Sequence, residues 1–412
     1  MSIKKILLAT RPLTPPWDEA SKNFAYFLAK SIKDPELQMN ILTTSTPLDG
    51  LGDNVVSHPI FPLYDASRAG HSFSQKVILS KYLFTESHRY DIVHYLFTPT
   101  ALNSALIRNF TYRRPKTVQT IATLREDLYG PKDWKKMLFA DRIVTYSDYS
   151  KRKLEANGFT GIERIYPGID LDLYAPKPKN EEALKHFDLT REDVVVMYPG
   201  EYVRLGATDM LVEMLITYLK SQSSDCHPEL VEGSSQIETD SSTTVGMTRA
   251  KTITFIFGCR IKNEADQKKK DEVVAKLTQA GIIDCVRFTD TWKDMPTLYN
   301  LSDIVIFPVE NMRGKFDIPL AIIEAYACGK PVILSDLEIF QEFSSPEFSV
   351  TIPLARQSLS EGGRTLWQTI LDLQSDESKR KRLGTNARTF TEQFFDLKNT
   401  AQSYERLYAS LQ

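Results

Sequence analysis

Long hydrophobic runs are missing from this sequence, and so is a strong net charge. No apolar stretch approaches the roughly 20 residues that a membrane-spanning helix needs. The first residues, MSIKKILLATRP, join a basic start to a short apolar run, which predicts a first strand rather than a signal peptide. The formal net charge is only -2, so no overall basic field attracts nucleic acid. We therefore expect a cytoplasmic protein that does not bind nucleic acid.

Cysteine is also scarce, and its spacing excludes two further classes of protein. The chain has 4 cysteines, none of them in a Cys-x-x-Cys pair: Cys226, Cys259, Cys285 and Cys328. This pattern indicates neither a zinc site nor a disulfide framework, so we expect reduced thiols.

What the chain does have is length and regular alternation. At 412 residues, 42% of them hydrophobic, it is too long for one ordinary core and predicts two domains. Apolar runs of strand length alternate with segments of helical spacing in both halves. The strand-like runs are 4–10, 38–44, 91–97, 116–123, 140–147, 194–200, 252–258, 286–290, 302–308 and 330–336. The alternation predicts an α/β fold with two doubly wound domains and a cleft between them, where ligands bind beyond the carboxyl ends of the strands.

Two segments interrupt the alternation. Near Ala175 to Asn180 the chain loses periodicity and becomes rich in proline and charge, so we place the boundary between domains 1–177 and 178–390 there. Residues 221–250 are polar and rich in serine and threonine, which predicts a disordered insertion. Its CHPELVEGSS core resembles a translated genomic repeat element. The alternative is a loop that contacts a substrate or partner.

Glu324 is the most unusual residue of the second half. Pro319 and Gly329 stand where a helix would begin and end, and the helical neighbours of Glu324 are apolar. A carboxylate on an apolar face must be paired or bound, because burying a bare charge costs several kcal/mol. Glu324 is therefore a candidate ligand contact. The alternative is a structural carboxylate paired with an arginine or with backbone amides.

The loop after residues 194–200 is a candidate phosphate site. Gly200 and Gly206 bracket a strand-to-helix turn that also contains Glu201 and Arg204. Glycines let the backbone approach a phosphate, and a helix start offers N–H groups and a positive dipole end. The alternative is that the glycines only make a tight turn. Asp317 caps the helix of Glu324 or joins a second anion site at the start of that helix.

The first half contributes candidates at two strand ends. Asp18 and Glu19 follow the first strand, where they could bind sugar hydroxyls or simply cap the next helix. His94 follows an apolar run in the sequence DIVH, which suits a polar contact or acid/base catalysis. The alternative for His94 is a satisfied structural residue.

Taken in order, these pieces resemble the family 4 (group 1) glycosyltransferases of the GT-B fold. The resemblance is carried by four stretches: IVTYSDYSKRKLEANGF with IERIYPGIDLDLYAP, VVVMYPGEYVRLGATDML, VRFTDTWKDMPTLYNLSDIVIFP, and PLAIIEAYACGKPVILSD. It covers nearly the whole chain apart from the insertion. It implies two Rossmann-like domains facing a cleft, and a C-terminal helix, 391–412, that crosses back to the first domain.

The resemblance also implies an activity and a set of sites. The activity is transfer of a sugar, with retention, from a nucleotide-sugar donor to a glycan, lipid or other acceptor, in envelope or polysaccharide synthesis. It would need no metal and no cofactor, since the nucleotide-sugar is the donor substrate. Glu324 matches the second glutamate of the Glu-x7-Glu motif, which contacts the donor ribose. The first domain would bind the acceptor through Asp18, Glu19 and His94. The donor side would comprise Gly200, Glu201, Arg204, Gly206, Asp317, Ile318, Pro319, Leu320 and Glu324.

Several motif positions depart from the family pattern. The first glutamate of Glu-x7-Glu falls at Phe316, the phosphate-loop arginine at Glu201 and its lysine at Leu205. Leu96 stands where a second histidine is usual, and Trp17-Asp18 replaces a glycine pair. Without cations, a diphosphate leaving group loses much of its electrostatic stabilisation. The sequence thus leaves two hypotheses, a divergent active transferase and a catalytically degenerate nucleotide or glycan binder. A nucleotide-sugar epimerase of related architecture explains less.

A basic cluster in the first half suggests a further partner. Arg108, Arg113, Arg114 and Lys116 lie near Tyr112, as a lipid acceptor at a membrane surface would require. The alternative for such a charge run is an ordinary solvated loop.

Overall fold

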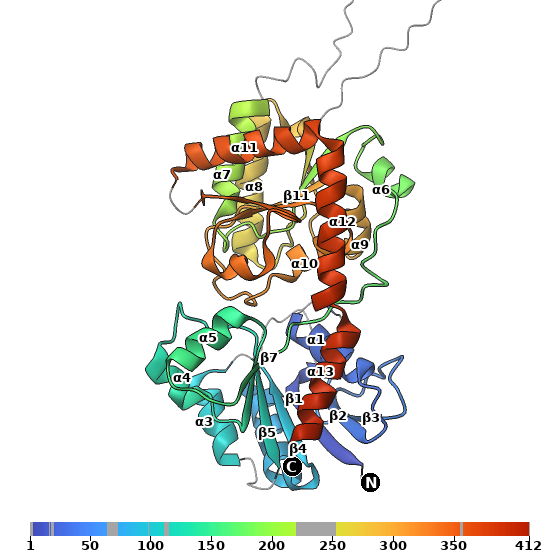
Figure 1. Cartoon of the computed structure of the whole chain (residues 1–412), viewed down its shortest axis with the longest axis vertical. Helices are drawn as coiled ribbons and strands as arrows, with labels where there is room; N and C mark the ends of the chain where they lie inside the picture. The colour runs from blue at the N-terminus through green and yellow to red at the C-terminus, as the bar shows by residue number, and fades with distance from the viewer. Residues whose placement is uncertain are drawn as a thin grey trace, which may run out of the picture. The chain divides into compact units, whose positions relative to one another are not determined.

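A computed structural model describes residues 3–15, 17, 20–63, 73–97, 99–110, 115–219, 253–354 and 357–411. The predicted insertion at 221–250 lies outside these residues, as do Asp18 and Glu19. The chain forms two compact units (Figure 1). The first unit contains residues 1–172, 312–323 and 390–412, and the second contains residues 173–311 and 324–389.

The first unit is built on a seven-stranded parallel sheet in the order β3-β2-β1-β4-β5-β6-β7. Its strands are β1 Lys4–Leu13, β2 Leu37–Thr43, β3 Val55–His58, β4 Ile92–Leu96, β5 Lys116–Ile121, β6 Arg142–Thr145 and β7 Ile162–Arg164. Its helices are α1 Ala20–Ser31, α2 Phe73–Glu86, η1 Ser87–Arg89, α3 Ala101–Phe110, α4 Pro131–Met137, α5 Asp148–Ala156 and α13 Leu397–Ser410.

Helices cover both faces of this first sheet. Ile6 and Leu8 of β1 pack in one core with α1 and with Tyr404 of the C-terminal helix α13. Leu7 and Ala9, which alternate with them, pack in a second core with α2 and α3. Because both faces are buried, β4 is apolar or buried at every position, which is why the strands read as unbroken apolar runs.

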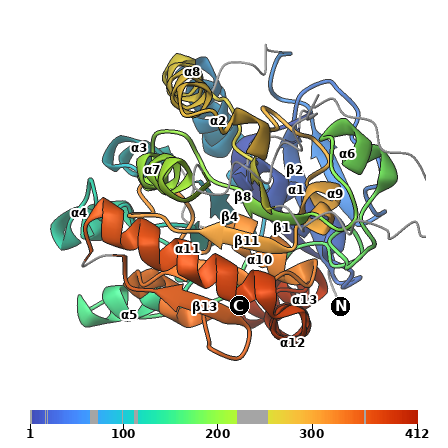
Figure 2. The same cartoon turned by 90° about the horizontal axis from the view of Figure 1, so that it is seen from above.

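The second unit has a six-stranded parallel sheet in the order β10-β9-β8-β11-β12-β13. Its strands are β8 Val194–Tyr198, β9 Ile253–Phe257, β10 Val286–Phe288, β11 Ile304–Phe307, β12 Val332–Ser335 and β13 Ser349–Ile352. Its helical segments are α6 Glu181–His186, α7 Ala207–Leu219, α8 Glu264–Gln279, η3 Ile283–Cys285, α9 Met295–Leu301, η4 Glu338–Phe343 and α11 Leu359–Ser375. Two further helices, α10 Leu320–Ala327 and α12 Glu377–Phe394, contain residues of both units. Helices α7 and α11 pack side by side (Figure 2).

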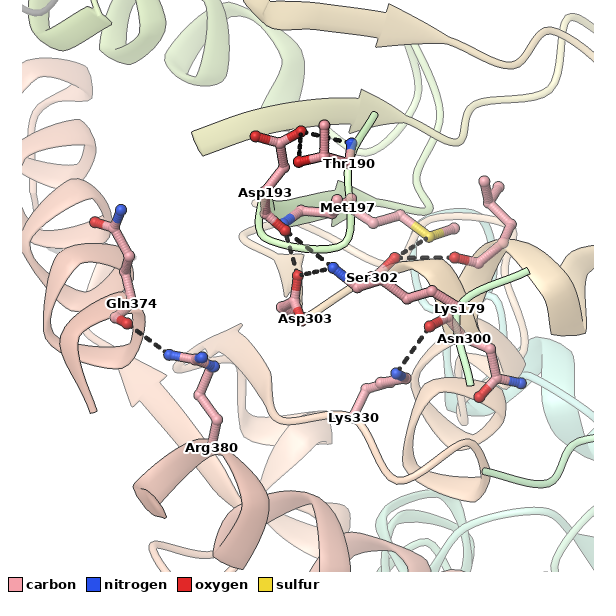
Figure 3. A network of polar contacts seen from close by, with 12 residues as sticks. Lys179, Thr190, Asp193, Met197, Asn300, Ser302, Asp303, Lys330, Gln374 and Arg380 are labelled. Carbon is pink, nitrogen blue, oxygen red and sulfur yellow. Dashed lines mark hydrogen bonds and ion pairs between the residues drawn. The ribbon is translucent and has the colours of Figure 1, made fainter. Parts of the chain in front are cut away.

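The segment that enters the second unit is tied to it by polar contacts. Asn300 is buried, accepts from the Lys177 N–H at 2.8 Å and donates to the Ala175 carbonyl at 3.0 Å. Lys179 donates to Asp303 at 2.7 Å and to the Asp193 carbonyl at 2.9 Å, as Figure 3 shows. The proline-rich stretch is therefore packed as part of the second unit.

The strand order reverses at a comparable point in both sheets. In each sheet, the second and third strands lie on one side of the first strand, which is β1 or β8. The fourth strand, β4 or β11, lies on its other side. Loops at the carboxyl ends of these two strands form the usual binding position of doubly wound sheets. This architecture confirms the predicted pair of doubly wound, Rossmann-like domains, and α13 confirms the predicted return of the C-terminal helix to the first one. None of the helices within the described residues combines the length and apolar character needed to cross a bilayer.

Candidate functional site

The loop between β8 and α7 lies at the reversal point of the second sheet, and close packing explains its glycines. A Cβ at Gly200 would overlap the Tyr198 ring, and one at Gly206 would lie 2.5 Å from Oε2 of Glu310. Gly206 also has a φ of +85°, which side chains other than glycine rarely adopt. The Glu310 N–H donates to the Leu205 carbonyl at 2.9 Å, so the loops after β8 and β11 are joined.

Two cations gather on one carboxylate in this loop. Glu201 is buried, and its oxygens accept from Arg204 Nε at 2.6 Å and Arg204 Nη2 at 2.7 Å. Lys262, which follows the neighbouring strand β9, also donates to Glu201 Oε1. The side chains of Arg204 and Lys262 remain 41% and 32% exposed, so a buried anion holds two accessible cations at the sheet edge. The three formal charges sum to a net positive charge, which suits an anionic ligand.

The structure divides the predicted phosphate-loop residues into two kinds. Gly200, Gly206, Glu201 and Arg204 do lie together, as predicted. Because Glu201 is buried and accepts from both cations, its carboxylate positions Arg204 and Lys262, and a direct contact of Glu201 with the donor stays a prediction. Sequence reasoning missed Lys262. The available signal was its place just after an apolar strand, in a loop at the same sheet edge.

Glu324 lies on α10 and is paired with tyrosine hydroxyls. Tyr299 donates to Glu324 Oε2 at 3.1 Å, and Tyr174 is a second hydrogen-bond partner. Burial raises the pKa of Glu324 to about 7, and the two tyrosine hydrogen bonds oppose this rise. The expected structural partners, an arginine or backbone amides, are thus replaced by neutral hydroxyls. A partly exposed carboxylate without a cation among these partners keeps acceptor capacity for further hydroxyl groups.

Asp317 is occupied within the first unit. Its Oδ2 accepts from Ser147 Oγ at 2.8 Å and from Ser150 Oγ, and its N–H donates to the Ala122 carbonyl at 2.8 Å. Burial raises the pKa of Asp317 to about 7, against the lowering effect of the serine hydrogen bonds. Asp317 and Ile318 are both buried, so their predicted contact with the donor stays a prediction that this geometry does not support. Pro319, at the helix start, is buried as well, and Leu320 is partly exposed, so a role for their backbone stays a prediction.

His94 is a core residue. The strand β4 continues for two residues beyond it, so His94 is inside the strand rather than at its end. Its Nδ1 lies 2.6 Å from the Tyr408 hydroxyl and its Nε2 lies 2.7 Å from Thr120 Oγ1. Complete burial lowers the pKa of His94 to about 3, which leaves the ring neutral. These contacts favour the alternative of a satisfied structural residue, and the catalytic role of His94 stays a prediction that its complete burial does not support.

In the loop after β1, the structure describes Thr14, Pro15 and Trp17. Trp17 stacks on Tyr26 with ring centroids 4.3 Å apart, and its carbonyl accepts from Asn23 Nδ2 at 3.1 Å. Asp18 and Glu19 lie outside the described residues, so their acceptor-binding role stays a prediction.

Two Rossmann-like sheets and a C-terminal helix returning to the first unit define a GT-B class protein. Residues 22–173 match the family model for Glycosyltransferase Family 4, and residues 251–352 match that for Glycosyl transferases group 1. Together the two matches span more than half of the chain. The chain therefore belongs to the family 4, group 1 glycosyltransferases.

A curated relative and several solved structures agree with this family. The D-inositol 3-phosphate glycosyltransferase of Gordonia bronchialis is 24% identical over 238 residues, which are 57% of this chain but only 44% of that protein. The structure of Anabaena Alr3699/HepE in complex with UDP and glucose has a TM-score of 0.69 at 17% identity, covering 99% of this chain and 100% of that one. The sucrose-phosphate synthase of Thermosynechococcus elongatus gives 0.68 at 14% identity, covering 99% of each chain. WaaG, a glycosyltransferase involved in lipopolysaccharide biosynthesis, gives 0.63 at 12%, covering 98% of this chain and 100% of that one. At these identities the structural likeness concerns the fold.

Proposed function

We propose that this chain transfers a sugar, with retention, from a nucleotide-sugar donor to a glycan or lipid-linked acceptor in envelope or polysaccharide synthesis. The observation that carries the proposal is the pair of cations, Arg204 and Lys262, on Glu201 at the reversal point of the second sheet. The family membership supports the transferase class. The structures of HepE with UDP and with UDP-glucose support a nucleotide-sugar as donor.

Arg204 and Lys262 would hold the diphosphate of the donor. The sequence departs from the family pattern by placing Glu201 and Leu205 where cations are usual. Arg204 lies one residue before Leu205, and Lys262 follows the neighbouring strand β9, so both bring positive charge to the same loop. As the bond to the sugar breaks, negative charge grows on the departing diphosphate, and these two cations would stabilise it without a metal ion.

Glu324 would bind the ribose of the donor. Tyr299 and Tyr174 donate hydrogen bonds that fix the carboxylate of Glu324. The remaining lone pairs of this carboxylate can accept hydrogen bonds from two vicinal hydroxyls of the ribose. The carboxylate form is the better acceptor. Since burial raises the pKa of Glu324 to about 7, we expect donor binding to depend on pH near neutrality.

Turnover tests this proposal. A panel of nucleotide-sugars is incubated with the full chain and candidate glycan and lipid-linked acceptors, and the anomeric configuration of the product is read by NMR. We expect the double variant Arg204→Gln/Lys262→Gln to lose at least about 100-fold in kcat/KM, since each donor to a developing anion contributes about that much. The matched control is Lys276→Gln, a lysine of α8 paired with Glu272. Equal turnover in all three proteins would overturn the proposal, and an inverted product would overturn retention.

One observation favours the second candidate, a degenerate nucleotide or glycan binder. Phe316 stands at the first acidic position of the Glu-x7-Glu motif and packs against Tyr146 with ring centroids 5.5 Å apart, while the neighbouring Asp317 is buried. No carboxylate at these two positions would then reach the transferred sugar. Calorimetric binding of a nucleoside diphosphate, with no transfer or hydrolysis across the donor panel, would favour this candidate, and any specific turnover would exclude it.

A further inference from the structure

Glu201 places a negative charge in the loop that is proposed to bind a diphosphate. It stands where the family pattern has an arginine. Its side chain is only 6% exposed, and its oxygens accept from Arg204 Nε at 2.6 Å, from Arg204 Nη2 at 2.7 Å and from Lys262 Nζ. The two cations of the site therefore share one buried carboxylate, and this arrangement must affect any anion that they bind.

The backbone and the burial of Glu201 fix this carboxylate in place. The Glu201 carbonyl accepts from Thr208 Oγ1 of α7 at 3.3 Å and from the hydroxyl of Tyr198, at the end of β8, at 3.4 Å. Arg204 and Lys262 are 41% and 32% exposed, so an arriving phosphate can reach them, whereas the Glu201 side chain is buried. We therefore expect Glu201 to stay bonded to both cations when an anion binds.

The fixed carboxylate changes the balance of charge that a ligand meets. Through protein, a carboxylate a few ångströms from a phosphate repels it by more than the free energy of a tenfold change in affinity. A nucleoside diphosphate carries about one more negative charge than its nucleotide-sugar, because its terminal phosphate no longer carries the sugar. Two cations without a counter-ion would therefore bind the product of the transfer more tightly than the donor, and the negative charge of Glu201 opposes this preference.

We propose that Glu201 is a fixed counter-ion that weakens the binding of the released nucleoside diphosphate to Arg204 and Lys262, and so speeds its departure after transfer. Product release limits turnover in many enzymes, so a site of maximal positive charge would be a slow one. The inference rests on the proposed function, since it takes the diphosphate as the anion of this site. If Glu201 served only to position the two cations, its removal would weaken binding instead of strengthening it.

Calorimetry of the full chain with UDP, GDP and ADP tests the sign of this effect. Glu201→Gln removes the negative charge and keeps the size of the side chain, whereas Glu201→Asp keeps the charge and shortens the side chain. We expect Glu201→Gln to bind the nucleoside diphosphate at least about tenfold more tightly than the wild type, with a steeper salt dependence. Glu201→Asp should bind it no more tightly than the wild type. The gain of Glu201→Gln should be smaller with UDP-glucose, GDP-mannose or ADP-glucose, the corresponding nucleotide-sugars.

Turnover supplies a second measurement that a merely structural change would not reproduce. With the donor that the wild type uses, Glu201→Gln should lower kcat and KM together and strengthen inhibition by the nucleoside diphosphate, because the product leaves more slowly. The matched control is Glu213→Gln, an exposed carboxylate of α7, which should bind and turn over as the wild type does. Circular dichroism confirms that all variants fold.

The possible outcomes separate this inference from the proposed function. Weaker or equal binding of the nucleoside diphosphate by Glu201→Gln would overturn the counter-ion role and leave Glu201 as a residue that positions the cations. Failure of the proposed diphosphate site would show differently, as equal affinity of the wild type and Arg204→Gln/Lys262→Gln. If neither the wild type nor Glu201→Gln binds any of the three nucleoside diphosphates, both proposals are overturned.

Discussion

At the reversal point of the first sheet, β4 carries His94, a neutral ring sealed between Tyr408 and Thr120. At the reversal point of the second sheet, the loop after β8, the strand whose place in the order is that of β1, carries Glu201 with two accessible cations, Arg204 and Lys262. The strand order up to this point is the same in both sheets. Topology therefore sets where a ligand can bind, whereas the side chains decide whether a polar group there is sealed in the core, as His94 is, or holds accessible charge, as Glu201 does.

The largest expected change in stability is in the first unit, at His94. We expect His94→Leu to lower the free energy of unfolding by about 2 kcal/mol, because the Tyr408 hydroxyl loses its partner in the core. Urea denaturation measures this cost. Nucleoside diphosphate affinity should not change. The exposed His88→Leu is the matched control and should stay within about 0.5 kcal/mol of the wild type.

The same residue predicts a pH dependence with a definite sign. The pKa of His94 is lowered from 6.5 to about 3 in the folded protein, so the unfolded chain binds more protons between these values. The stability contributed by neutral His94 is present above pH 6.5 and is lost as the pH falls through this window. The difference between wild type and His94→Leu should therefore shrink on acidification. A constant difference would contradict a buried neutral ring.

A smaller effect is expected on donor binding, at Glu324. We expect Glu324→Gln to weaken nucleotide-sugar affinity about tenfold at a pH of about 8, because a carboxylate accepts hydroxyl hydrogen bonds better than an amide. Because the pKa of Glu324 is raised to about 7, the wild-type carboxylate is protonated as the pH falls below that value, and its advantage should disappear. Calorimetry at several pH values measures this change. Glu347→Gln, at an exposed position, is the control, and an advantage that survives at low pH would exclude the proposed role.

The smallest expected effect is at Asp317. We expect Asp317→Asn to cost about 1 kcal/mol of unfolding free energy at low pH, where the protonated acid fits its buried site with Ser147 and Ser150. Its folded pKa of about 7 lies above the ordinary 3.8, so the stability from the acid is lost as the pH rises through about 7. The cost of the substitution should therefore shrink above neutrality in denaturation experiments. A cost that grows with pH would show that Asp317 is held as a carboxylate, and the exposed Asp372→Asn should show no such dependence.

The fold could be predicted because its signal is local. Strands such as β4 and β8 are buried on both faces, so each leaves an unbroken apolar run in the sequence, and glycines mark the tight turn after β8. The candidate residue Arg204 was found for the same reason, since it lies in that loop.

The remaining site features depend on contacts between distant residues. His94 meets Tyr408 across 314 positions, Asp317 meets Ser147 across 170, and Lys262 meets Glu201 across 61. No local pattern reveals such partners. Sequence reasoning therefore could not show that tertiary contacts engage His94 and Asp317, and it missed Lys262.

The most direct test of the Glu201 cluster as the diphosphate site is a calorimetric titration of a nucleoside diphosphate into the full chain. Wild type, Arg204→Gln/Lys262→Gln and the control Lys276→Gln/Lys381→Gln are compared at low and high salt. The account predicts that the first double variant loses at least about 100-fold in affinity and most of its salt dependence, because two charge-assisted contacts are removed. The control should match the wild type. Equal affinity in all three proteins would contradict the assignment of the diphosphate to the Glu201 cluster.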